Sequence, residues 1–142
     1  MPYDTKIRYD TKIAIAVRED LATWQKLNVA GFLAGGLVGA YPELKGEDYN
    51  DASGRFYGPL IRQPVLIFAA TSEQLTSMLQ RAQQRGVRPH LYTQELFATG
   101  NDSDNRAAVA AIATAALDLV GLAIHAERKE ADKITKGLSL HG

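Results

Sequence analysis

The chain has no cysteine and no excess of charge of either sign. Without cysteine, disulfides, thiolate nucleophiles and cysteine-ligated zinc or iron–sulfur sites are excluded. Sixteen Lys and Arg residues balance sixteen Asp and Glu residues. Because proteins that bind nucleic acid gain much of their affinity by neutralising phosphates, this balance argues against a nucleic-acid partner. The histidines His90, His125 and His141 lack the spacing of a metal site, so neither a metal nor a cofactor is expected.

The sequence predicts neither a signal peptide nor a membrane span. Residues 1–12 are polar and charged, without the apolar core of a signal peptide. The longest apolar run, residues 107–124, is rich in alanine and contains Asp118 and Gly121. This composition favours a buried helix and strand over a membrane span. We therefore expect no membrane partner and a cytoplasmic location.

What is present is the composition of one folded domain. The 142 residues are 46% hydrophobic and 23% charged, as in ordinary globular proteins. The motif Tyr-Asp-Thr-Lys-Ile occurs at residues 3–7 and again at residues 9–13. We interpret the first copy as part of a tail and the second as the beginning of the first strand. The prediction is a tail over residues 1–11 and a single α/β domain over residues 12–142.

Apolar periodicity predicts the elements of the first half. Residues 12–18 form an apolar run typical of a buried strand, and residues 23–41 have a helical pattern that Pro42 ends. Three glycines weaken this helix, because glycine is a poor helix former. The turn residues at 50–54 predict a small hairpin inside a loop over residues 42–63.

The second half contains the strongest local signal. Residues 64–70 read as a buried strand, Thr71 and Gln74 fit a capping box, and the helix that follows ends at Gly86. A strand over residues 87–93 comes next, so this strand and the one over residues 64–70 are expected to be parallel with a right-handed crossover. A helix over residues 103–116, a strand over residues 117–124 and a helix over residues 127–136 complete the prediction.

Two sets of motifs are similar to known families. Val-Arg-Glu-Asp-Leu at residues 17–21, with residues 119–123 and 132–135, resembles type 2 peptidyl-tRNA hydrolases. A more specific set resembles the uncharacterised family called domain of unknown function 2000, and it comprises residues 24–29, 97–100, 104–106 and 136–141. The resemblance implies a three-layer α/β/α sandwich with a mixed, mostly parallel four-stranded sheet, like that of the type 2 hydrolases.

The sequence departs from the hydrolases at their functional motifs. The family's lysine at the start of the first helix has Lys26 as its counterpart only with a gap, and the later histidine falls near Gly35. The hydrolase segment Asp-Ala-Gly-Arg-Thr is replaced by Gln-Glu-Leu-Phe-Ala-Thr at residues 94–99. We therefore expect binding of a small anionic or polar ligand rather than the hydrolase reaction.

Candidate site residues follow from the rule that ligands bind at the carboxyl ends of parallel strands. They are polar side chains that follow these strands or begin the neighbouring helices: Asp20, Lys26, Asn28, Thr99, Asn105 and Arg106. Structural roles are open for several. Asp20 or Thr23 would cap a helix, Asp102 and Asp104 would complement a helix dipole, and Arg106 would pair with one of them. Asn28 is expected to be buried, while Trp24, Tyr92 and Phe97 are expected in the core.

Three interpretations remain. The first is a ligand-binding domain without known activity. The second is an esterase or amidase with modified peptidyl-tRNA hydrolase chemistry, in which Lys26 or Asn28 polarises a carbonyl and Asp20 or Glu95 positions water. The third is a homodimer formed by the apolar helices.

Overall fold

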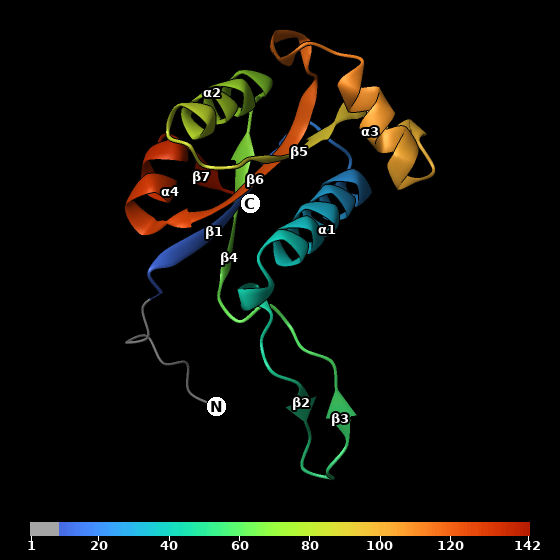
Figure 1. Cartoon of the computed structure of the whole chain (residues 1–142), viewed down its shortest axis with the longest axis vertical. Helices are drawn as coiled ribbons and strands as arrows, with labels where there is room; N and C mark the ends of the chain where they lie inside the picture. The colour runs from blue at the N-terminus through green and yellow to red at the C-terminus, as the bar shows by residue number, and fades with distance from the viewer. Residues whose placement is uncertain (1–8) are drawn as a thin grey trace.

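The computed structural model describes residues 9–142, so most of the expected tail lies outside the described residues. One five-stranded sheet has the order β5-β6-β1-β4-β7. Its strands are β1 (Thr11–Arg18), β4 (Val65–Ala70), β5 (His90–Thr93), β6 (Leu119–Glu127) and β7 (Ser139–Leu140). The helices are α1 (Thr23–Ala40), α2 (Ser72–Gln84), α3 (Asp102–Ala110) and α4 (Arg128–Ile134). In Figure 1, α2 and α4 lie on one side of the sheet, and α1 and α3 lie on the other.

The sheet corrects the prediction of four mostly parallel strands. Among the described strands of this sheet only β1 and β4 pair in parallel, whereas β1–β6, β5–β6 and β4–β7 are antiparallel. Helix α2 does connect two strands that run in the same direction, but β4 and β5 are separated by β1 and β6. The later strand β6 inserts between β5 and β1, and this long-range pairing leaves no local mark in the sequence. The fifth strand, β7, is only two residues long and gives no periodic signal.

Strand β1 feeds two cores because its side chains alternate between the faces of the sheet. Ile13, Ile15 and Val17 pack under α1. Ala14 and Ala16 face α2 and α4, where small side chains suit the close approach of two helices. All five are at most 1% exposed. Helices therefore cover both faces of the sheet.

Helix α1 lies close to the sheet because of a glycine in β6. Val29, Leu33 and Leu37 form the buried stripe of α1 at four-residue spacing. A Cβ atom on Gly121 would collide with Cγ1 of Val29 and would lie 3.0 Å from Cδ1 of Leu33. A side chain at this position would push α1 away from the sheet.

The local signals of α2 are confirmed. Thr71 caps the helix, with its side chain accepting from the backbone N–H of Gln74 at 3.2 Å and its own N–H donating to the Gln74 side chain at 2.9 Å. Gly86 follows the helix with φ +69°. The later elements differ more. Helix α3 ends at Ala110 rather than Ala116, and a short 3-10 turn, η3 (Thr114–Ala116), precedes β6. The exposed alanines after Ala110 have no buried face to hold them in a helix.

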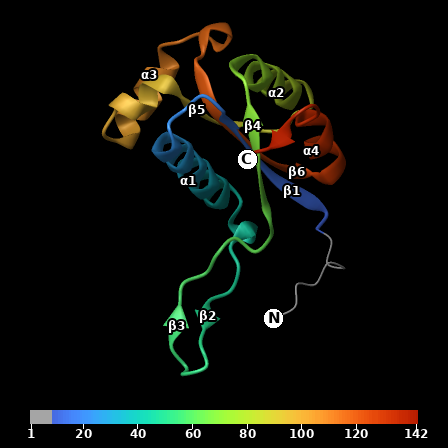
Figure 2. The ribbon, with the colours of Figure 1, turned by 180° about the vertical axis from the view of Figure 1, so that it is seen from behind.

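A hairpin arm extends from the body beyond the 3-10 turn η1 (Pro42–Leu44). It consists of residues 45–61, with the short strands β2 (Tyr49–Asn50) and β3 (Phe56–Tyr57). Asp51 closes its tip, accepting from the N–H groups of Ser53 and Arg55 and from the Tyr57 hydroxyl. The turn expected at residues 50–54 is therefore confirmed. Both views show the arm projecting away from the sheet and helices (Figure 1, Figure 2).

Candidate functional site

A groove lies between α1 and α3, over the edge strand β5. It consists of two adjoining cavities of about 590 and 400 Å³, which share Phe32, Tyr92, Leu96, Asp102 and Asn105. We call it the α1–α3 groove. The larger cavity is also lined by Leu33, Gly36, His90, Leu91, Arg106, Val109 and Ala110. The smaller cavity is also lined by Trp24, Asn28, Phe97, Thr99, Gly100 and Asn101.

The floor of the larger cavity is the open edge of β5. His90 and Tyr92 point to the α1 face of the sheet, whereas Leu91 packs in the core under α2. All three line the cavity although successive side chains point to opposite faces, so the cavity reaches the backbone of the strand. In the described part of the chain β5 pairs only with β6. An edge strand presents unpaired N–H and C=O groups along its free side, and these would be available to a ligand.

His90 provides a buried polar atom without a partner. Its Nδ1 is inaccessible to solvent and makes no hydrogen bond. Burial lowers the pKa of His90, and the nearby positive charge of Arg88 lowers it further. The imidazole is therefore neutral at pH 7, with one nitrogen able to donate and the other able to accept. Buried polar groups are nearly always paired, so this atom is unusual, but it has no surface in the open cavity and a ligand would reach it only after the ring turns.

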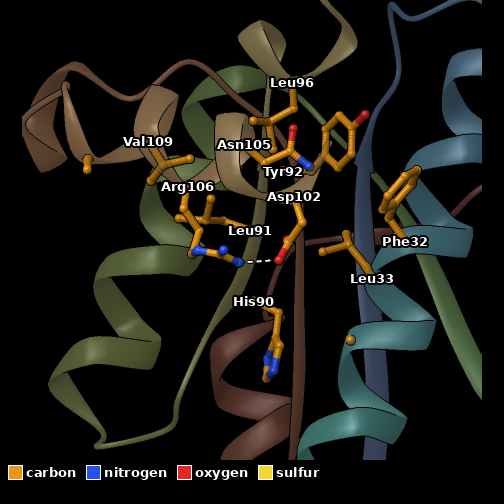
Figure 3. Close-up of a pocket in the computed structure, with 12 residues that line it drawn as sticks. Phe32, Leu33, His90, Leu91, Tyr92, Leu96, Asp102, Asn105, Arg106 and Val109 are labelled. Atoms are coloured by element: carbon orange, nitrogen blue, oxygen red, sulfur yellow. Dashed lines mark hydrogen bonds and ion pairs between the residues drawn. The ribbon is translucent and has the colours of Figure 1, made fainter. Parts of the chain in front are cut away.

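Ionic groups at the groove are already paired. Asp102 and Arg106 lie one turn apart on α3 and form an ion pair, which Figure 3 shows between His90 at one end of the cavity and Asn105 and Tyr92 at the other. Both side chains are mostly exposed. The guanidinium of Arg106 is thus neutralised by Asp102 of the same helix, which is one of the structural roles considered from the sequence.

Aromatic rings follow one another along the groove. The ring centroids of Trp24 and Phe97 are 5.9 Å apart, those of Phe97 and Tyr92 are 5.1 Å apart, and those of Tyr92 and Phe32 are 5.6 Å apart. Tyr92 is buried, as expected, and burial raises the pKa of its phenol while a hydrogen bond with the Asn28 side chain opposes the shift. Trp24 is 61% exposed rather than in the core. It lies in the first turn of α1, whose outer side no described element covers.

The loop before α3 holds the other polar groups. The Asn101 side chain accepts from the N–H of Asp104 at 2.8 Å and caps α3. Thr99 donates to the carbonyl of Leu96 at 2.9 Å, and its hydroxyl also contacts the Asn105 side-chain oxygen. These contacts fix the Asn105 amide against the groove. An amide held in this way can donate to or accept from a ligand.

The six residues expected in a site are divided by the structure. Asn28, Thr99, Asn105 and Arg106 line the groove. Asn28 is exposed at the groove surface rather than buried in the helix, which corrects the expectation of a buried amide.

Lys26 and Asp20 do not line these cavities. Lys26 is two residues before Asn28 on α1, and residues at that spacing point to different sides of a helix. Asp20 accepts from Nε of Arg18 at 2.7 Å, while Nη1 of Arg18 donates to Asp118 at 2.9 Å. Arg18 therefore ties the end of β1 to the beginning of β6, with Asp20 as its second partner, and the N-cap of α1 is Ala22 rather than Asp20 or Thr23.

Sequence reasoning missed His90, Phe32 and Asn101. The pair Asn101 and Asp104 has the spacing of an N-cap and its partner and was recognisable. His90 had no such signal, because its environment depends on the position of β5 beside α1. In residues 9–142, no group of three or more His, Asp or Glu side chains is arranged to hold a metal ion. None of the helices in the same part of the chain is long and apolar enough to cross a membrane.

Comparisons with known proteins agree with one another. Residues 11–142 match the family described as protein of unknown function (DUF2000). No curated protein matches the chain. A solved structure of a protein of unknown function from Agrobacterium tumefaciens strain C58 is similar, with a TM-score of 0.92 and 44% sequence identity. The match covers 95% of this chain and 100% of that one. The chain therefore belongs to the DUF2000 family.

Proposed function

We propose that this domain binds a small, largely apolar ligand with a polar group in the α1–α3 groove. The apolar cavity of about 590 Å³ beside the free edge of β5, with the Asn105 amide held at its wall, carries the proposal. Cavities of roughly 300–1,000 Å³ with apolar walls and a few fixed polar groups are typical of small-molecule sites. The polar groups here are His90, Asn105 and the free edge of β5.

The charges at the groove favour a neutral polar ligand over an anion. Arg106 already pairs with Asp102, and Asp104 adds a second carboxylate in the same helical turn. Lys26 is the one other cation among the six candidates, and it does not line the groove. The sequence predicted an anionic or polar ligand, and the pairing of Arg106 supports the polar alternative.

The aromatic lining narrows the ligand further. Phe32, Tyr92 and Phe97 pack on one another and line the groove, so their outer edges and faces can contact the ring of a ligand. A flat ring with an amide or hydroxyl group would place its ring against these residues. Its polar group would reach His90 or Asn105.

A thermal-shift screen tests this proposal. The panel contains neutral aromatic amides and alcohols, matched aromatic carboxylates and aromatic phosphates. We expect the neutral compounds to raise Tm and the effect to be lost in His90→Leu. His141→Leu is the matched control, because His141 also has a buried, unpartnered ring nitrogen but lines neither cavity. Stabilisation by the carboxylates or phosphates alone, abolished by Arg106→Ala, would contradict the neutral ligand.

The alternative is a hydrolase with the fold and a modified chemistry of the type 2 peptidyl-tRNA hydrolases. Its support is the Asn28 amide in the smaller cavity, beside Tyr92, where it would polarise a carbonyl oxygen. Glu95, which the sequence predicted to position water, has a buried Oε2 and lines neither cavity, so the groove does not place it beside Asn28.

Release of tRNA from an N-blocked aminoacyl-tRNA separates the two functions. The hydrolase predicts turnover that Asn28→Ala removes and Lys26→Ala retains, because Lys26 lies outside both cavities. Absence of turnover, with a type 2 hydrolase active in the same assay, would rule out this alternative and leave ligand binding.

A further inference from the structure

The outer face of α1 is apolar and uncovered. Trp24, Leu27 and Phe32 are 61%, 69% and 56% exposed. Lys26 is the only charged residue of this 18-residue helix. A surface helix normally turns a polar face to water, and a helix that is apolar on all sides is normally buried. Phe97 and Tyr92 contact Trp24 and Phe32 at the edge of the α1–α3 groove, and nothing else in residues 9–142 covers this face of α1.

A flat strip crosses the same face. Gly31, Gly35 and Gly39 follow Leu27 at four-residue spacing, and a Cβ atom on any of these glycines would meet nothing within 4 Å. The body of the protein therefore gives no reason for glycine at these positions, although glycine disfavours a helix. Leu27, Asn28, Gly31, Phe32 and Gly35 line a shallow groove of about 520 Å³. We call this the outer groove of α1.

The hairpin arm has protruding apolar side chains, whereas the outer groove of α1 is a shallow depression. Tyr49, Phe56, Tyr57 and Leu60 are 53%, 78%, 53% and 66% exposed. They stand on a two-stranded hairpin that projects from the end of α1 away from the body (Figure 2). An isolated two-stranded hairpin is only marginally stable in water, so such an arm normally rests on another surface.

We propose that a second copy of this chain covers both features, with the arm of each copy lying in the outer groove of α1 of the other. Protruding apolar side chains and a flat apolar groove occur on the same chain, which is what a self-complementary two-fold interface requires. The net charge of zero adds no long-range repulsion between copies.

The exposed area agrees with a dimer. The seven large side chains of α1 and the arm are between 53% and 78% exposed. With side chains of roughly 200 Å² each, they leave on the order of 900 Å² uncovered on each copy. A standard stable interface buries about 800 Å² per partner.

Light scattering after gel filtration tests the assembly. We expect twice the 15.5 kDa mass of one chain. Leu27→Asp and Phe56→Asp each should give monomers with unchanged far-UV circular dichroism. Leu140→Asp is the control, since Leu140 is 63% exposed but lies on β7, at the opposite edge of the sheet from β5. A monomer at every concentration reached, or a dimer that survives both substitutions, would overturn the proposal.

Disulfide cross-linking tests the arrangement. Because the chain has no native cysteine, every disulfide must join two introduced cysteines. Chains with Gly35→Cys are mixed with chains with Phe56→Cys and oxidised. The proposal predicts a disulfide between the two kinds of chain, and none between Gly35→Cys and Leu140→Cys chains. Disulfides that form only within the Gly35→Cys population would show that α1 packs on α1 and that the arm lies elsewhere. Capture of a different protein by the wild-type monomer would replace the second copy as the occupant.

Discussion

Gly121 sets how closely α1 approaches the sheet, and Gly121→Ala should therefore destabilise the protein. The added Cβ would collide with Cγ1 of Val29 and lie 3.0 Å from Cδ1 of Leu33. Val29 is fully buried and Leu33 is 3% exposed, so neither side chain has solvent to move into. Valine is also stiff about χ1, which leaves a shift of α1 as the main means of relief.

The cost follows from the effect of adding atoms to a packed core. Inserting one methyl group typically costs about 1–3 kcal/mol, and the stiffness of Val29 puts Gly121→Ala in the upper half of that range. For a domain of this size, each kcal/mol lost from the free energy of unfolding lowers Tm by about 2–4 °C. We therefore expect Tm to fall by about 5–10 °C. The larger cavity should also change, because Leu33 lines it.

Urea unfolding followed by circular dichroism measures this effect, at one fixed protein concentration because association would shift the apparent stability. Val29→Ala added to Gly121→Ala should cost less than the sum of the two single changes, because Val29→Ala removes the atom that the new Cβ would strike. Gly39→Ala is the control. Its Cβ meets nothing within 4 Å, so its helix should gain up to ~1 kcal/mol. If Gly121→Ala unfolds within ~0.5 kcal/mol of the wild type, the close approach of α1 does not depend on this glycine.

Three further outcomes are expected. Burial lowers the pKa of both His90 and His125, so the folded protein binds fewer protons than the unfolded chain below about pH 6.5. The contribution of the two histidines to the free energy of unfolding should therefore be fully present above that pH and be lost as the pH falls below it. In urea titrations at pH 5.5 and 7.5, a double His90→Asn, His125→Asn variant should show a smaller difference in the free energy of unfolding between the two pH values than the wild type. Burial opposes the charge of Arg18, but its bonds to Asp20 and Asp118 outweigh this and raise its pKa. Arg18→Met should cost about 1–2 kcal/mol in urea unfolding, because both carboxylates remain partly solvated; an unchanged midpoint would mean that the bonds add nothing. Thr71→Ala should cost about 1 kcal/mol by removing the cap of α2, and Thr71→Ser should restore most of it.

Local signals in the sequence predicted what depends on neighbours in the chain. The apolar run of β1, the bounds of α1 and the capping box of α2 appear at nearly the expected residues. Each follows from a few adjacent side chains and their period. The strand order does not, because the pairing of β6 with β1 joins Thr11 to Glu127. A single sequence holds no record of that contact.

The residues of the α1–α3 groove also divide into those that local sequence predicts and those that depend on contacts between distant segments. Thr99, Asn105 and Arg106 lie close in sequence to the end of β5, and the rule for strand ends placed them beside one another. Lys26 and Asn28 were grouped by sequence distance, although their spacing on a helix turns them to different sides. His90 became visible only once β5 and α1 were in position, because its burial comes from α1 rather than from its own strand.

The insertion of β6 between β5 and β1 also has a consequence for synthesis of the chain. β5 has no strand partner until β6 is present, and β1 has only β4. Both wait for residues 119–127. A ribosome-bound chain that stops after α3 therefore holds open strand edges next to the apolar residues Ile13, Ile15 and Val17. Open edges of this kind pair readily with other chains. The protein is consequently exposed to aggregation in the interval just before β6 emerges.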